Sequence, residues 1–134
     1  MSVLGELQPN KVFKYFEEIC SIPHGSRNLQ QISDYLVDFA KAHELKYRQD
    51  EDLNVIIWKD GSKGYEASEP VILQGHMDMV AVKEADCDKD MEKEGLDLEI
   101  NGDYISAKGT SLGGDDGIAV AYTLAVLDDE EMAH

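Results

Sequence analysis

Two of the side chains that could bind a metal ion stand close together in the sequence. His76 and Asp78 lie two residues apart at the end of an apolar run. Because two residues is the period of a β-strand, we expect both side chains on the same face of the chain. One imidazole nitrogen could then bind a metal while the carboxylate orients the ring. Taken alone, this spacing more often marks the end of a strand with nothing bound.

A glycine-rich stretch at residues 108–117 supplies further candidate ligands. Its glycines allow the backbone to approach a ligand closely, and Asp115 and Asp116 carry the oxygen donors that metal ions accept. Taken alone, the stretch is better explained by an aspartate cap on a helix behind a flexible loop. Together with His76, however, Asp115 completes a donor pair that suits Zn²⁺, and one aspartate can bridge two metal ions.

The strands that must position these residues are predicted from apolar and β-branched runs. Residues 71–80 predict a buried strand, which would deliver His76 and Asp78 to its carboxyl end. Residues 54–58 predict a neighbouring strand of the same sheet. An Asn-Gly pair within the alternating residues 98–107 predicts a β-hairpin.

Helices are predicted where apolar residues recur at helical spacing. The first spans residues 8–20, and the second aligns apolar residues from 29 to 40, with Ser26 or Asn28 as its cap. Residues 118–127 are apolar all round and predict a helix buried on the sheet, with the two aspartates at its amino end. The predicted fold class is α/β, with a mixed sheet flanked by helices.

Length and charge limit the classes of protein that need to be considered. The 134 residues, 43% of them hydrophobic, suffice for one compact domain. Acidic residues outnumber basic ones 28 to 12, and the formal charge of −16 disfavours nucleic acids and anionic membrane surfaces as partners. We expect a soluble cytoplasmic protein, because no leader or membrane-spanning segment is recognisable and Cys20 and Cys87 do not suggest a disulfide framework.

An alternative metal site lies in the charged segment 83–99, which we expect to be exposed. Asp86, Asp88 and Asp90 alternate as at the start of a calcium-binding loop. The sixth position of such a loop requires glycine, but this sequence has Met91 there. A solvated acidic surface therefore explains the segment better than a calcium module at residues 86–90.

Residues 73–80 and 109–119 together resemble the co-catalytic zinc peptidase superfamily, which includes aminoacylases and glutamate carboxypeptidases. Within it, the chain is most similar to the aminoacyl-histidine dipeptidase family, also called Xaa-His or cytosol non-specific dipeptidases. Further agreement at residues 16–24 and 49–57 extends the resemblance from about residue 7 to residue 127. Several motifs in the same order are more specific than either motif alone.

The resemblance implies a role for each candidate residue. His76 matches a ligand of one zinc ion, and Asp78 matches the catalytic-site aspartate that orients this histidine. Asp115 matches the aspartate that bridges both metals, and its peptide bond to Asp116 is cis in the superfamily. The implied cofactor is a pair of Zn²⁺ ions, with Co²⁺ or Mn²⁺ as substitutes. The implied reaction is hydrolysis of Xaa-His or other dipeptides by a metal-activated water.

This sequence also departs from the family pattern. Position 116 is usually asparagine in the family. The glutamate pair that supplies the general base and a further ligand lies beyond Asp115 in the family, and Glu130 and Glu131 come too early to match it. We therefore expect residues 1–134 to be the amino-terminal portion of the catalytic domain, without the remaining ligands or the lid and dimerisation domain.

Several consequences follow if the chain is such a portion. Two ligands from separate loops imply weak metal binding, and the absent base implies that the chain alone is inactive. Whole members of the family are expected to form homodimers, whereas this chain is expected to self-associate through exposed sheet surface. The alternative is a non-catalytic binding or interaction domain that retains the peptidase scaffold.

Overall fold

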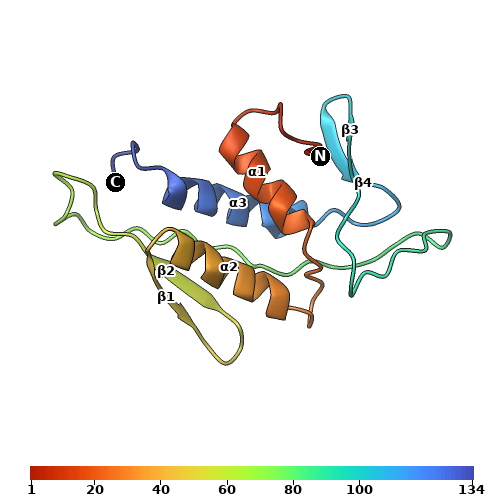
Figure 1. Ribbon diagram of the computed structural model, residues 1–134, viewed down its shortest axis with the longest axis horizontal. Coiled ribbons are helices and arrows are strands. Elements are labelled where there is room, and N and C mark those ends of the chain that lie inside the picture. Colours follow the sequence, from red (N-terminus) through yellow and green to blue (C-terminus); the bar gives the residue numbers. More distant parts are fainter.

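The computed structural model describes residues 1–134 and contains helices and short strands in mixed order. Helix α1 packs against α3, whereas α2 packs against the sheet formed by β1 and β2 (Figure 1). The elements are α1 (Asn10–Cys20), α2 (Gln30–Ala42), β1 (Lys46–Gln49), β2 (Val55–Trp58), β3 (Leu98–Asn101), β4 (Tyr104–Ala107) and α3 (Gly114–Asp128).

The strands form two separate antiparallel sheets of two strands each, which confirms the α/β class but does not give one mixed sheet. In the first sheet, Gln49 of β1 lies opposite Val55 of β2. In the second, β3 and β4 form the hairpin that the sequence predicts, with Asn101 opposite Tyr104. The lysine- and arginine-containing strand β1 was not predicted, because its side chains are mostly exposed and show no apolar pattern.

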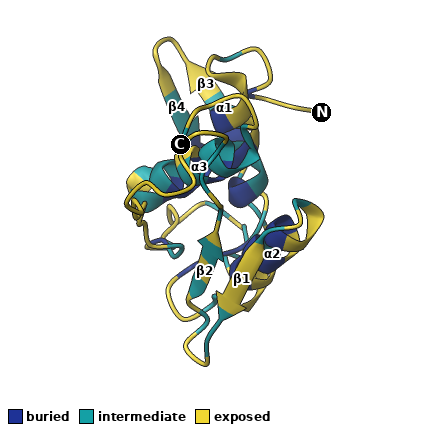
Figure 2. Cartoon of the chain, turned by 90° about the vertical axis from the view of Figure 1, so that its left-hand side faces the viewer, coloured by how far each residue is buried: buried dark blue, intermediate teal, exposed yellow.

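The three predicted helices are confirmed, and their buried sides supply most of the core. Figure 2 shows the buried residues gathered on α1, α2 and α3, while the strands are mostly half-buried or exposed. Gly117 of α3 is buried against α1, and a Cβ atom there would lie 3.3 Å from Cε2 of Phe16. No helix is both long enough and apolar enough to cross a membrane.

Two details of the helix predictions are wrong. Helix α3 does not lie on a sheet: its main contact is with α1, and the side chain of Tyr122 on another face is 52% exposed. Neither predicted cap of α2 acts as one, since the helix starts after Leu29 without a side-chain cap. Ser26 and Asn28 instead make contacts with distant segments of the chain.

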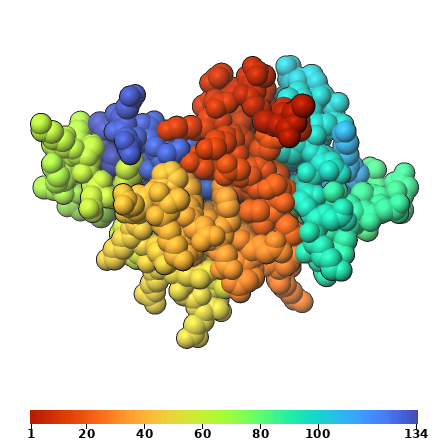
Figure 3. Space-filling view, in the orientation of Figure 1, coloured from red at the N-terminus to blue at the C-terminus, as the bar shows by residue number.

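The predicted buried strand at residues 71–80 is also wrong. Residues 69–78 make no hydrogen bond from backbone to backbone, and the side chains of Val71 and Ile72 are 83% and 85% exposed. A strand forms only with a hydrogen-bonded neighbour, and β2, the expected neighbour, pairs with β1 instead. Residues 69–78 run across the width of the molecule (Figure 1). They lie between two parts of the chain that project at opposite ends of the molecule, near residues 65 and 85 (Figure 3).

Both cysteines, Cys20 and Cys87, are free. Cys20 is buried in the core, and its burial raises the pKa of the thiol to about 12. The thiol of Cys20 is therefore a packing group that remains protonated at neutral pH.

Asp128, at the end of α3, connects all three helices. Its carboxylate accepts a hydrogen bond of 2.7 Å from the hydroxyl of Tyr15 and lies 3.1 Å from Nε2 of His43, just after α2. Lys11 of α1 lies 3.6 Å away. Burial alone would raise the pKa of Asp128, but these three partners outweigh that effect and lower the pKa below its usual value.

We expect Asp128→Ala to lower the free energy of unfolding by about 1–2 kcal/mol at neutral pH, because it removes hydrogen bonds to a charged group. The depressed pKa means that this stability is present above the pKa of the unfolded chain and is lost as the pH falls through the folded-state value. Urea unfolding at several pH values tests this, with Glu130→Ala as the exposed control. An equal effect of both substitutions would contradict the assigned role.

We expect the chain to self-associate through the apolar side chains exposed at residues 71–73. Ile72→Lys should shift the sedimentation of the chain toward monomer, whereas Tyr104→Lys, at a 77% exposed residue of the hairpin, should not. A wild-type chain that sediments as a monomer at high concentration would disprove this prediction.

Candidate metal centre

The imidazole of His76 lies between two carboxylates. Its Nε2 is 3.1 Å from Oδ1 of Asp115, and its Nδ1 is 3.1 Å from Oδ1 of Asp78. His76 and Asp115 are 39 positions apart in the sequence, so the fold brings together the residues that the two motifs predict. The same Nδ1 is also 3.0 Å from the backbone oxygen of Asp78.

Close approach of residues 71–78 to the start of α3 makes this arrangement possible. A Cβ atom at Gly75 would lie 3.0 Å from Oδ2 of Asp116 and 3.4 Å from Cβ of Ala119. A side chain at position 75 would therefore crowd Asp116 and Ala119 at the start of α3. The peptide bond between Asp115 and Asp116 is cis, as the resemblance implies.

Ser26, in the loop between α1 and α2, holds Asp78 from the side opposite His76. Its hydroxyl donates a hydrogen bond of 2.5 Å to Oδ2 of Asp78, 52 positions away. The Ser26 amide donates to the backbone oxygen of Met79 at 3.0 Å, and the Met79 amide donates to that of His24, also at 3.0 Å. The sequence suggested only a helix cap for Ser26, because a pattern of neighbouring residues does not indicate contacts between positions this far apart in the sequence.

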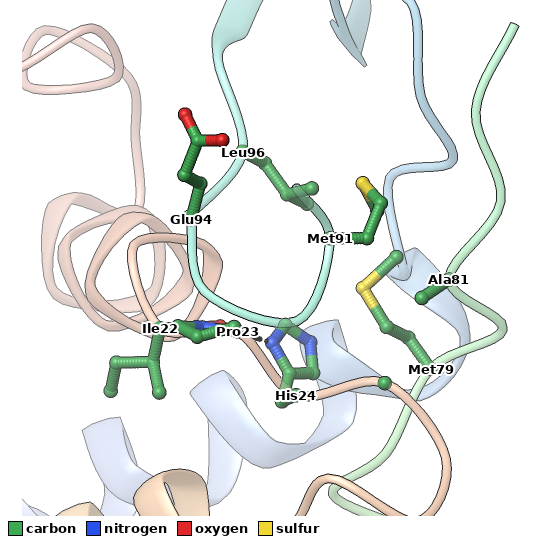
Figure 4. Close-up of a pocket in the computed structure, with 9 residues that line it drawn as sticks. Ile22, Pro23, His24, Met79, Ala81, Met91, Glu94 and Leu96 are labelled. Carbon is green, nitrogen blue, oxygen red and sulfur yellow. Dashed lines mark hydrogen bonds between the residues drawn. The ribbon is translucent and has the colours of Figure 1, made fainter. Parts of the chain in front are cut away.

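His24 lies beneath this backbone contact and is only 2% exposed. Burial lowers the pKa of His24, so the ring is neutral, and Nδ1 lies 2.6 Å from the backbone oxygen of Ile22. Figure 4 shows the ring beside the sulfur-containing chains of Met79 and Met91. The cavity between them measures about 10 Å³, which is room for one water molecule at most and excludes a substrate.

The pKa values of His76 and Asp78 shift in opposite directions. The hydrogen bond to Asp115 is the main cause that raises the pKa of His76, and the contacts with Asp78 add to it. The hydrogen bond from Ser26 is the main cause that lowers the pKa of Asp78. The carboxylate of Asp78 therefore stays ionised, and the imidazole of His76 is a better base than an isolated one.

The donor pair fits a zinc ion in chemistry and spacing. Tetrahedral zinc with bonds of about 2.0–2.1 Å places two of its ligand atoms about 3.3 Å apart, close to the observed separation of Nε2 and Oδ1. Both groups are accessible, since the side chains of His76 and Asp115 are 52% and 96% exposed. No set of three or more metal-binding side chains converges anywhere in the chain, so two donors are all that it brings to this position.

The alternative calcium ligands do not form such a cluster. Asp90 accepts a hydrogen bond from the backbone of Glu92 and lies 3.3 Å from Lys93. Asp86 and Asp88 are exposed, in keeping with the predicted solvated surface. Glu130 and Glu131 are also exposed, beyond the far end of α3 from Asp115.

We expect His76 in the metal-free chain to titrate above the ordinary histidine pKa of about 6.5. Asp115→Asn should lower this pKa, because the charged partner of the imidazolium is lost, and the neighbouring Asp116→Asn should change it less. Imidazole proton shifts followed against pH by NMR measure both effects. A pKa at or below 6.5 in the wild-type chain would contradict the contact with Asp115 in solution.

No protein-family model matches the chain, but it is similar in sequence and fold to known dipeptidases. All 134 residues align with the cytosol non-specific dipeptidase of Escherichia coli (strain K12) at 40% identity, covering 28% of that protein. The crystal structure of aminoacylhistidine dipeptidase from Vibrio alginolyticus matches 99% of this chain and 27% of its own, with a TM-score of 0.95 and 38% identity. Sequence and fold thus confirm the resemblance: the chain is similar, over a little more than a quarter of their length, to dipeptidases of the cytosol non-specific and aminoacylhistidine kind.

Proposed function

We propose that this chain provides part of the active site of a cytoplasmic dinuclear zinc dipeptidase. His76 and Asp115 are the proposed metal ligands, and Asp78 orients the imidazole. The observation that carries the proposal is the position of the His76 ring, with one nitrogen 3.1 Å from Asp115 and the other 3.1 Å from Asp78. The dipeptidase names of both similar proteins supply the reaction class.

Each of the three side chains has a distinct task in this proposal. Asp78 accepts a hydrogen bond from Nδ1–H of His76, so that the lone pair on Nε2 is free for the metal. Asp115 projects a carboxylate with two oxygens, enough to contact two ions at once. Zinc ions bound there would polarise the scissile carbonyl and lower the pKa of a water molecule. With Asp78 bound to Nδ1, the His76 ring is already oriented as a metal ligand before the metal binds.

The remaining ligands and the general base are proposed to come from residues outside this chain. Its residues offer two donors at the site, whereas a zinc ion usually takes four ligands. We infer that the chain binds zinc weakly and does not hydrolyse dipeptides by itself. The substrate class is a dipeptide, and the acidic surroundings, with Asp116 beside the ligands, favour cations over anions.

Zinc titration of the chain, followed by amide and imidazole NMR signals, tests the assignment. We expect the signals of His76 and of residues 115–116 to shift first, and His76→Ala or Asp115→Ala to abolish those shifts. His134→Ala, at a histidine that contacts Asp60 instead, is the matched control. In a longer protein that contains these residues, the first two substitutions should lower kcat/KM for dipeptides by at least about 100-fold. Zinc shifts that persist in His76→Ala would refute the proposed site.

A further inference from the structure

We propose that Ser26 is a positioning residue for the metal ligand His76 and acts through Asp78. This inference rests on the proposed function, because it assigns a partner to a ligand of that site. It adds a residue from the loop between α1 and α2 to a site otherwise built from residues 76–78 and the start of α3. The contacts form one line, from Ser26 through Asp78 and His76 to Asp115.

The carboxylate of Asp78 is held at both of its oxygens. Oδ2 accepts the hydrogen bond of 2.5 Å from Ser26, and Oδ1 lies 3.1 Å from Nδ1 of His76. Rotation of the carboxylate would break one contact or the other. Ser26 thus fixes the plane of Asp78, and Asp78 in turn fixes the edge of the His76 ring that faces away from the metal position.

The backbone of Ser26 is itself anchored, so its hydroxyl is aimed before any ligand binds. Gly25 and Met79 form a parallel β-bridge, and the Ser26 amide donates to the Met79 oxygen at 3.0 Å. The hydroxyl makes only one other, longer contact, of 3.3 Å, with that same oxygen. It does not cap α2, which has no side-chain cap.

A competition for one proton gives the role of Ser26 a measurable signature. A neutral imidazole carries a single N–H, and Asp78 and Asp115 lie on opposite ring nitrogens of His76. With Asp78 fixed by Ser26, the proton stays on Nδ1, which leaves Nε2 free for a metal. Without Ser26, Asp78 can turn away, and the proton moves toward Nε2 and Asp115. A metal ion can then bind Nε2 of His76 only after this proton has left.

The test compares Ser26→Ala with Ser26→Thr, which retains a hydroxyl at this exposed position, and with Ser21→Ala. Ser21 is an exposed serine of the same loop whose hydroxyl bonds only to the backbone oxygen of Glu18. We expect Ser26→Ala to weaken zinc binding by about 10–100-fold, the range for lost partners of metal ligands. Ser26→Thr should recover most of the affinity, and Ser21→Ala should leave it unchanged.

Imidazole ¹⁵N shifts of the metal-free chain, at a pH where His76 is neutral, give the second readout. They should show mainly the Nδ1–H form in the wild type and more of the Nε2–H form in Ser26→Ala, with unfolding midpoints unchanged. The same tautomer and zinc affinity in both would overturn the inference. Failure of the proposed function would be a different result: the NMR signals of His76 in the wild-type chain would not shift when zinc is added. In that event the tautomer measurement still decides the role of Ser26.

Discussion

The packing of α3 against α1 is the constraint on which the other features depend. It brings the backbone of Gly117 against the ring of Phe16, and no side chain of α3 intervenes at that point. Because α3 is fixed there, its first turn presents Asp115 at one end, while Asp128 at the other end is tied to Tyr15 and His43. One helix contact therefore sets both the candidate metal centre and the connection among the helices.

The candidate metal centre is assembled from three places that are distant in the sequence. The loop between α1 and α2 contributes Ser26, the unpaired segment contributes His76 and Asp78, and the start of α3 contributes Asp115. Only Asp115 falls within the bounds of a helix, and its own backbone angles are not helical. The site is consequently organised by side-chain hydrogen bonds and by the backbone contact between Gly25 and Met79, rather than by a continuous sheet.

Features that depend on neighbours along the chain were predictable from the sequence. Helical spacing gave α1, α2 and α3, and the Asn-Gly pair gave the hairpin of β3 and β4. His76, Asp78 and Asp115 were identifiable because histidine and carboxylates are chemically distinctive and match a known pair of motifs. Their meeting in space agrees with that expectation.

Features that depend on distant partners were not predictable in the same way. The apolar residues 71–73 read as a buried strand, but burial and pairing require a neighbour that the sequence pattern does not specify. Strand β1 was not predicted because its residues are polar and its strand conformation depends on pairing with β2. Ser26 was read as a cap since serine is common there, whereas its partner lies 52 positions away.

The unpaired backbone at residues 69–78 has a dynamic consequence. Its amides have no hydrogen-bonded acceptor on the main chain, whereas the amide of Met79 is bonded to His24. Deuterium should therefore replace hydrogen at these amides at almost the rate of a free peptide, with protection beginning abruptly at Met79. His76 thus lies in this unprotected stretch, three residues before the hydrogen-bonded Met79, and a ligand that binds its ring should slow amide exchange in the residues between them.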